Sequence, residues 1–177
     1  MKKNIIIALL SIVLAVVFYK YFNEGSVISD REFLEFGSRQ DSPKSLQMYY
    51  HIERYADVYD VPLYVAYNIA YIETKYKGPY DWEYDPCKSS PSGALGPMQI
   101  MISTCNKINK ESVSRSKLKN DIEYNIETSM KLLHRLYEKY HDWEKVCGSY
   151  NTGKPIVNSY ARFCANNKNY KSNWIKI

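Results

Sequence analysis

The sequence lacks the features that mark several large classes of protein. It contains no internal repeat and no low-complexity tract, and 24% charged with 45% hydrophobic residues is typical of a folded chain. The formal net charge is only +5, of which Lys2, Lys3 and Lys20 contribute three, so the remainder carries +2. Nucleic-acid binding requires a strongly basic stripe, so this charge balance indicates no nucleic-acid partner.

Histidine is scarce, and the few histidines are not spaced as metal ligands. His51, His134 and His141 are scattered along the chain, and no C-x-x-C motif accompanies them. A zinc site would need His, Cys or carboxylate ligands at short characteristic spacings. The sequence therefore predicts neither a metal site nor a cofactor.

Cysteine is also scarce, and the four residues are Cys87, Cys105, Cys147 and Cys164. None lies in a recognisable nucleophile motif, which argues against a cysteine protease. In a protein that folds outside the cytoplasm, four cysteines most simply form two disulfides. The sequence does not separate the three connectivities. It favours Cys87–Cys105 and Cys147–Cys164, since each pair flanks one expected structural unit.

An apolar run at residues 5–19 is interrupted only by Ser11, and it is shorter than the about 20 residues that a transmembrane helix needs. Lys20 can extend its ammonium group to the membrane surface, and Tyr21 and Phe22 can lie in the interface, which lengthens the span. We therefore expect residues 1–22 to form an N-terminal hydrophobic helix that anchors the chain in a membrane.

A cleaved signal peptide is the alternative for this segment. It would end in a small-x-small cleavage site, and Asn23-Glu24-Gly25 is a poor match. No cysteine follows the run directly, so a lipid-anchored N-terminus is unsupported. In either case the basic N-terminal end predicts a domain outside the cytoplasm, on the periplasmic or cell-wall side, or secreted if the segment is cleaved.

Residues 23–41 are expected to form a linker with a short helix near residues 30–36, and residues 42–177 are long enough to form one domain with its own core. Ser42-Pro43 resembles a helix start, and apolar residues then recur at helical spacing, so the fold class is mainly α. The expected helices cover residues 43–59, 62–74, 103–108, 121–140, 142–150 and 155–164. Residues 77–91 and 109–120 are expected loops, and the glycines in residues 93–101 predict one small irregular β-hairpin.

One carboxylate is placed unusually within the second of these helices. The residues that share its apolar face are Leu63, Ala66, Ile69, Ala70 and Glu73. Glu73 therefore projects from the apolar side, where partial desolvation raises its pKa, as a general acid near neutral pH requires. The alternative is a solvated glutamate at a fraying helix end.

Three motifs in order carry a family likeness. They are I-E-T at residues 72–74, S-P-S-G-A-L-G-P-M-Q-I-M-I-S-T-C at residues 90–105, and G-S-Y-N-T-G at residues 148–153. The chain resembles the soluble lytic transglycosylase (SLT) family, which shares its fold with goose-type lysozymes. The family's counterparts are a Glu followed by Ser, S-P-x-G-A-x-G-L-M-Q-I-M-P-x-T-A, and A-Y-N-A-G. A helix with Asn125-Ile126 and Leu132-Leu133 is similar to the family's N-I-x-x-G-x-x-Y-L, and the likeness covers residues 62–162.

The chain departs from the family pattern at several positions. These are Pro97 for Leu, Ile102 for Pro, Ser129 for Gly, and Ser149 and Thr152 for Ala. The segment between Glu73 and Gly93 is also several residues longer than expected. None of these changes removes a chemical group, so they concern groove shape and substrate preference more than activity.

The resemblance implies a lysozyme-like helical domain that acts on the glycan strands of peptidoglycan. Glu73 would protonate the oxygen between N-acetylmuramic acid (MurNAc) and N-acetylglucosamine (GlcNAc). It would then act as base on the muramoyl C6 hydroxyl, which closes a 1,6-anhydro ring without consuming water.

The resemblance also implies the substrate-binding residues. Ser90 would lie near the Glu73 carboxyl, and Gln99 and Met101 would line the muramoyl subsite. Tyr150 would bring its hydroxyl near Glu73 or the sugar. Asn151 belongs to the same set, although its side chain is expected to hold the turn through a bond to the backbone. Separately, Met98 is expected in the core, and Gly93 and Gly96 are expected at positive φ or close to the sugar.

Other functions stay open at this point. Most glycosidases use two carboxylates, and Asp81, Glu83 or Asp85 could supply the second in a goose-lysozyme-like hydrolase. A non-catalytic peptidoglycan-binding module is a third reading. The sequence does not separate an envelope-spanning secretion assembly, phage machinery and cell-wall remodelling as the setting.

Overall fold

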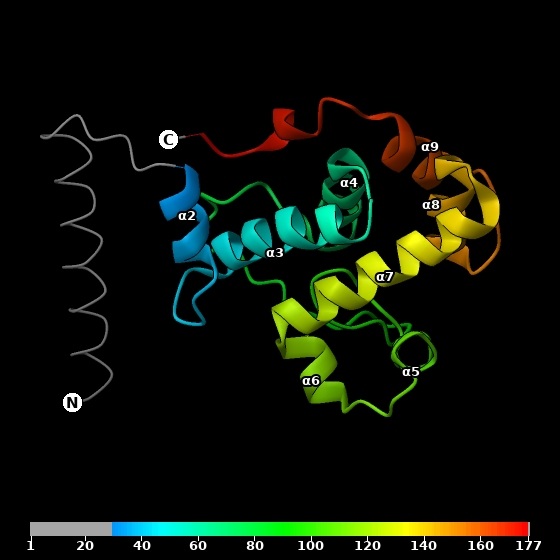
Figure 1. Ribbon diagram of the computed structural model, residues 1–177, viewed down its shortest axis with the longest axis horizontal. Helices are drawn as coiled ribbons and strands as arrows, with labels where there is room; N and C mark the ends of the chain where they lie inside the picture. Colours follow the sequence, from blue (N-terminus) through cyan, green and yellow to red (C-terminus); the bar gives the residue numbers. More distant parts are fainter. Residues whose placement is uncertain (1–29, 177) are drawn as a thin grey trace, which may run out of the picture. The chain divides into compact units, whose positions relative to one another are not determined.

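The computed structural model describes residues 30–176, so the expected hydrophobic helix and anchor at residues 1–22 lie outside the described part. The chain divides into two units, Met1–Glu35 and Phe36–Ile177. The helices are α2 (Asp30–Gly37), α3 (Lys44–Val58), α4 (Leu63–Thr74), α5 (Ile102–Asn109), α6 (Arg115–Asn120), α7 (Ile122–Tyr140), α8 (Trp143–Thr152), α9 (Ser159–Asn166) and the 3₁₀ helix η1 (Tyr170–Asn173) (Figure 1). None of the described helices is both long enough and apolar enough to span a membrane.

The predicted mainly helical class is confirmed, but the predicted hairpin is not formed as strands. Residues 30–176 hold only two isolated antiparallel bridges at this place, Ser89–Leu95 and Leu95–Ile100. Gly93, Gly96 and Gln99 all have positive φ, so the chain turns too often for a strand to continue.

Helices α6, α7, α8 and α9 each begin after a residue whose side chain caps the helix. Asp121 and Asp142 cap α7 and α8 through their side chains, as was predicted for Asp142. Ser42 does not cap α3, because its hydroxyl donates to the carbonyl of Arg39 at 2.7 Å. The last helix begins at Ser159 rather than at residue 155, because the Asn158 side chain caps it there.

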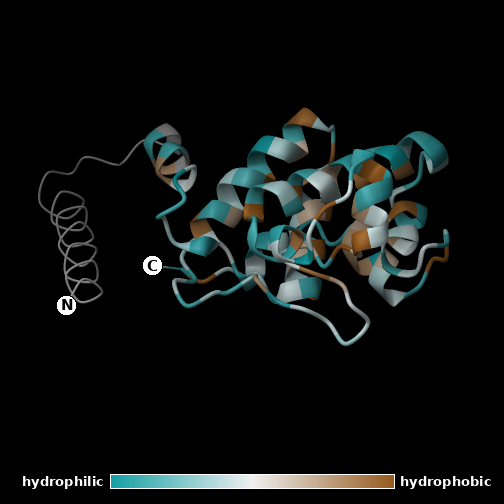
Figure 2. Cartoon of the chain, turned by 90° about the horizontal axis from the view of Figure 1, so that it is seen from below, coloured by the Kyte–Doolittle hydropathy of each residue, from teal (hydrophilic) through white to brown (hydrophobic). Residues whose placement is uncertain are grey.

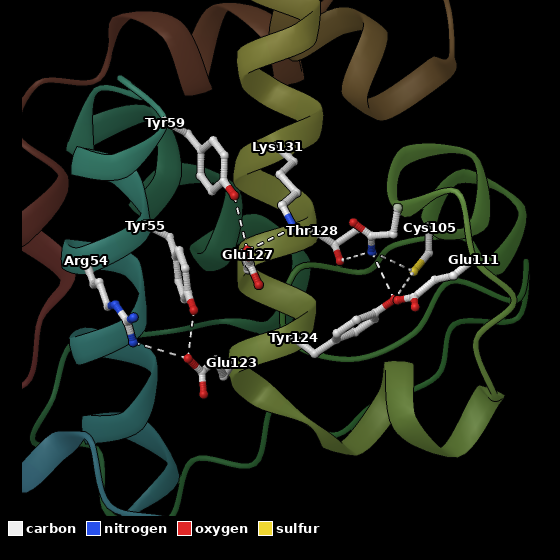
Figure 3. Close-up of polar contacts among 11 residues, drawn as sticks. Arg54, Tyr55, Tyr59, Cys105, Glu111, Glu123, Tyr124, Glu127, Thr128 and Lys131 are labelled. Atoms are coloured by element: carbon white, nitrogen blue, oxygen red, sulfur yellow. Dashed lines mark hydrogen bonds and ion pairs between the residues drawn. The ribbon is translucent and has the colours of Figure 1, made fainter.

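Helices α3 and α7 lie side by side, joined by a row of polar contacts (Figure 3). Tyr55 donates its hydroxyl to Glu123 at 2.7 Å, and Arg54 pairs with the same carboxylate at 3.3 Å. One turn further along, Tyr59 donates to Glu127 at 3.1 Å. These tyrosines use an apolar ring for packing and a hydroxyl for pairing, which explains how a core can contain many of them.

The core is formed by the apolar faces of the helices in the second unit. Figure 2 shows hydrophobic and hydrophilic residues alternating along the helices, which is the pattern of amphipathic helices. The largest fully buried side chains are Tyr67, Tyr76, Leu46, Met48, Ile52, Ile69, Leu95, Met98, Leu118, Ile126, Met130 and Leu133. Met98 was expected in the core, and its side chain is 0% exposed. Helix α4 packs against α3 and α9, and the loop at residues 95–100 is bonded to Asn125 of α7.

Candidate functional site

Glu73 lies in the last turn of α4, which ends where Lys75 adopts a left-handed conformation with φ 65°. The side chain is half-buried, and this burial raises the pKa of its carboxyl group. A hydrogen bond from Tyr160 and the charge of Lys75 act in the opposite direction. The C-terminal end of α4 also carries a partial negative charge, which disfavours a nearby carboxylate and so acts on the pKa in the same direction as burial. The predicted desolvation of Glu73 is therefore confirmed.

Thr74, the next residue, connects this end of α4 to the loops that follow it through hydrogen bonds. Its hydroxyl oxygen lies 2.9 Å from the Pro97 carbonyl oxygen and 2.6 Å from the Tyr84 hydroxyl oxygen. Thr74, Tyr84 and Pro97 are all buried, so water does not compete for these hydrogen bonds. Thr74 therefore holds the turn at residues 96–99 close to Glu73, the candidate acid.

The turn at residues 96–99 is held in an unusual backbone conformation. Gly96 has φ 72° and Gln99 has φ 52°, which is rare for a residue with a side chain. The Gln99 amide donates to the Gly96 carbonyl at 2.8 Å, which closes the turn from within. The predicted positive φ of Gly93 and Gly96 is confirmed.

Asn125 of α7 holds this turn from behind and is fully buried. Its amide nitrogen donates to the carbonyls of Leu95 at 2.9 Å and Leu118 at 2.8 Å, and its oxygen accepts from the Met98 backbone at 3.0 Å. A side chain on Gly96 would place its Cβ 2.6 Å from the Asn125 amide nitrogen. The sequence placed Asn125 in a family-like helix but did not predict this role.

Tyr150 of α8 also supports the turn. Its hydroxyl donates to the Met98 carbonyl at 2.7 Å. Burial raises the pKa of the Tyr150 hydroxyl, and the nearby charge of Glu73 raises it further.

Tyr160 of α9 is the residue that sequence reasoning missed. Its hydroxyl donates to Glu73 Oε1 at 2.7 Å. Burial, then the charge of Glu73, raises the pKa of Tyr160, so the hydroxyl keeps its proton and remains a donor. The sequence contains 18 tyrosines, and no spacing singles out this one.

The other predicted substrate residues are engaged in local contacts. The Ser90 hydroxyl accepts from the Ala94 backbone at 2.9 Å and pairs with Ser92 at 2.9 Å. Met101 is 41% exposed at the start of α5. Asn151 accepts from the side chain of Asn158, so it holds the α8–α9 connection through a side chain and not through the expected backbone bond.

All four cysteines are free thiols in the structure, so neither expected disulfide is present. Cys87 and Cys105 are in different surroundings: Cys87 lies beside Lys44 and Asp85, whereas Cys105 donates to the Tyr124 hydroxyl at 3.5 Å (Figure 3). Cys147 and Cys164, in contrast, are both fully buried, and interaction with Cys147 is the main cause that raises the pKa of the Cys164 thiol.

We also looked within the described residues for side chains arranged to bind a metal ion. Within residues 30–176, no group of three or more His, Cys, Asp or Glu side chains is arranged to hold a metal ion. The groups that the site brings together are one half-buried carboxyl group and the tyrosine hydroxyl bonded to it, beside the turn at residues 96–99.

Comparison with known protein families gives a match over most of the domain. The family model described as the transglycosylase SLT domain matches residues 50–173, which is well over half of the chain. This range contains Glu73, the turn at residues 96–99, Tyr150 and Tyr160. Neither a curated protein nor a solved structure matches the chain. The match over most of the domain shows that the chain belongs to the SLT transglycosylase family.

Proposed function

We propose that the protein is a peptidoglycan lytic transglycosylase that cleaves the MurNAc-β-1,4-GlcNAc bond and leaves a 1,6-anhydro-MurNAc end. Family membership supports the substrate and the general reaction. The observation that carries the assignment is the Glu73 carboxyl, whose burial raises its pKa and whose oxygen accepts the Tyr160 hydroxyl at 2.7 Å.

In the proposed reaction Glu73 acts twice. It first donates its proton to the glycosidic oxygen, which requires a carboxyl group that stays protonated toward neutral pH. The substrate's N-acetyl group supports the cation-like sugar centre. Glu73 then accepts the proton of the muramoyl C6 hydroxyl as this hydroxyl closes the anhydro ring.

The surroundings of Glu73 favour a mechanism with one carboxylate. Among the described residues, the groups that shift the pKa of Glu73 are Tyr160 and Lys75, and no second carboxyl group is one of them. Of the acids considered for a second carboxylate, Asp85 is paired with Lys44 at 2.7 Å. A hydrolase that uses Asp85 as its second carboxylate therefore has less support.

The substrate groove is proposed to run past the turn at residues 96–99. Gln99 and Met101 line the muramoyl subsite, and Ser90 and Tyr150 border it on either side. Asn151 contributes by holding the connection between α8 and α9. We further propose that residues 1–22 anchor the enzyme in a membrane with its catalytic domain outside the cytoplasm, which rests on the apolar run and its flanking lysines.

The test is a digest of purified peptidoglycan by the full chain in mild detergent, with mass spectrometry of the released muropeptides. Products lighter than lysozyme products by one water carry the anhydro end and support the proposal. Reducing-end products would make the protein a hydrolase. Release of nothing, while the protein still binds the glycan, would favour a binding module. Glu73→Gln is the matched control, since it keeps an oxygen for Tyr160 and removes the acid.

A further inference from the structure

The positive charge of the domain is concentrated in one short segment. Residues 1–41 contain five basic and five acidic residues, so residues 42–177 carry the whole formal net charge of +5. Residues 107–119, which we call the basic segment, contain five basic residues and one acidic residue and therefore carry +4. The basic residues are Lys107, Lys110, Arg115, Lys117 and Lys119.

These cations face solvent without a carboxylate partner. Four of them are exposed and Lys119 is partly exposed, and within residues 30–176 none of the five forms an ion pair. The one acid of the segment, Glu111, accepts the Tyr124 hydroxyl at 2.6 Å (Figure 3). The Lys117 ammonium lies over the ring of Tyr124, 4.2 Å from its centre. The basic segment therefore presents positive charge that an anionic partner can neutralise.

The basic segment is held in one arrangement by the side chains at its base. It includes the end of α5 and most of α6, and both helices pack against α7 (Figure 1). Leu118 is fully buried, the Asn109 amide donates to Thr128 of α7 at 2.8 Å, and the Asn106 side chain accepts from the Val113 backbone at 3.1 Å. The backbone that carries the cations is thus ordered before a partner binds, which lowers the cost of binding.

The basic segment adjoins the proposed muramoyl subsite at both of its ends. Met101, which is proposed to line that subsite, directly precedes α5, so Lys107 follows it by about 9 Å along the helix axis. At the other end, the Leu118 carbonyl accepts from the amide of Asn125 at 2.8 Å, and the same side chain bonds the turn at residues 96–99.

In peptidoglycan the muramoyl residue is the sugar that carries a peptide, and this peptide has free carboxylate groups. An extended peptide covers about 3.3–3.6 Å per residue, so three or four residues span the distance from Met101 to Lys107 or Lys110. We propose that the basic segment binds the carboxylates of the muramoyl peptide and so favours peptide-bearing strands over bare glycan. This inference rests on the proposed function, because that function supplies the muramoyl subsite.

The carboxylate requirement is tested by NMR titration of the full chain in mild detergent with two ligands. One is N-acetylmuramoyl-L-alanyl-D-glutamic acid, and the other is its D-isoglutamine counterpart, in which one carboxylate is an amide. The acid is expected to shift the backbone amide signals of Lys107 and Lys110 and to bind about threefold more tightly. The difference should vanish in 1 M salt, where the screening length is about 3 Å. Equal affinities at low salt would overturn the proposal.

A pair of matched variants assigns the preference to the basic segment. Lys107→Gln combined with Lys110→Gln should bind the acid and the amide equally. Arg135→Gln combined with Lys139→Gln removes the same charge from exposed positions near the end of α7 and should keep the wild-type preference. A preference that persists in the first variant, with an unchanged melting temperature, would overturn the proposal.

The same titration separates this partner from an anionic lipid or wall polymer. Glycerophosphoglycerol is a soluble phosphodiester with the charge of such headgroups. If it shifts the signals of Lys107 and Lys110 at lower concentration than the muramoyl acid does, the basic segment binds phosphodiesters and the proposal is overturned.

The result is also independent of the proposed function, since neither muramoyl ligand contains the bond that the enzyme would cleave. If the protein releases no muropeptides but still prefers the acid, the proposed reaction fails and the peptide-binding role holds. If it cleaves peptidoglycan but binds the two ligands equally, the reaction holds and the peptide-binding role fails.

Discussion

Replacing Tyr160 with phenylalanine removes one hydroxyl group from the site and keeps the ring that packs in the protein. The hydroxyl donates to Glu73 at 2.7 Å and stabilises the ionised carboxylate, so it lowers the pKa of Glu73 against the burial that raises it. Its removal should therefore raise the pKa of Glu73. Since Glu73 must be protonated to act as the acid, activity is lost as pH rises through this pKa.

The size of the rate effect follows from the charge that develops on Glu73. A hydrogen bond to a charged group contributes about 1.5–3 kcal/mol, and this contribution is largest once the proton has left the carboxyl group. Its loss corresponds to a fall in kcat of about tenfold to 150-fold. The binding of the glycan should change little, because Tyr160 acts on Glu73 and not on the sugar.

The assay is the initial rate of muropeptide release as a function of pH for the wild type, Tyr160→Phe and Tyr137→Phe. The alkaline limb of the profile should move to higher pH in Tyr160→Phe only. Tyr137 lies in α7 with its ring stacked on Trp143 at 4.5 Å, so its variant controls for the loss of a hydroxyl elsewhere. A slower Tyr160→Phe enzyme with an unmoved or lowered alkaline limb would refute the reasoning.

Three further predictions concern stability, each read by thermal unfolding. Burial raises the folded-state pKa of Glu73, so the wild type loses stability as pH rises from the ordinary glutamate pKa through the raised one. The melting temperature of Glu73→Gln should therefore be on the order of 2 °C higher than that of the wild type at neutral pH, and no higher in acid. Gly96→Ala should lower the free energy of unfolding by about 3 kcal/mol, because its added Cβ would lie too close to Asn125 and Leu118. Gly153→Ala should lower it by only about 1 kcal/mol, because Gly153 has a similar φ of 75° but no atom within 4 Å of an added Cβ. Equal losses would show that the contact of the Cβ at residue 96 is unimportant. Asn125→Asp loses two donated bonds and buries a charge, so it should cost at least about 3 kcal/mol, and a near-wild-type melting temperature would contradict its role.

Helix α7 has a strong apolar period that the sequence shows, because it buries one face against the core. Helix α4 was also predicted, although it buries the consecutive residues 65–70 and is therefore covered on all sides. Helix α6 was expected to be loop, because only Leu118 is buried in it and the rest is polar. Its start was nevertheless marked by Ser114, whose hydroxyl accepts from Lys117.

The residues of the candidate site likewise differ in how far the sequence could predict them. Glu73 could be predicted because its own helix places it on the apolar face. Tyr160 and Asn125 could not, because their roles depend on elements distant in sequence, α9 against α4 and α7 against the turn at residues 96–99. The contact of Tyr150 with the Met98 carbonyl likewise depends on how α8 approaches this turn. Local periodicity carries no information about such pairings.

Two opposing influences on Glu73 are needed together in the proposed reaction. Burial keeps the carboxyl group protonated and ready to act as acid, but burial alone would also make the carboxylate too unstable to persist until the C6 hydroxyl attacks. The bond from Tyr160 stabilises this carboxylate, and it does so most strongly when the charge is present. Burial comes from the position of Glu73 on α4, whereas the bond comes from α9. The placement of α9 therefore sets the balance between the acid and base roles, and changes that move α9 should affect the rate before they affect substrate binding.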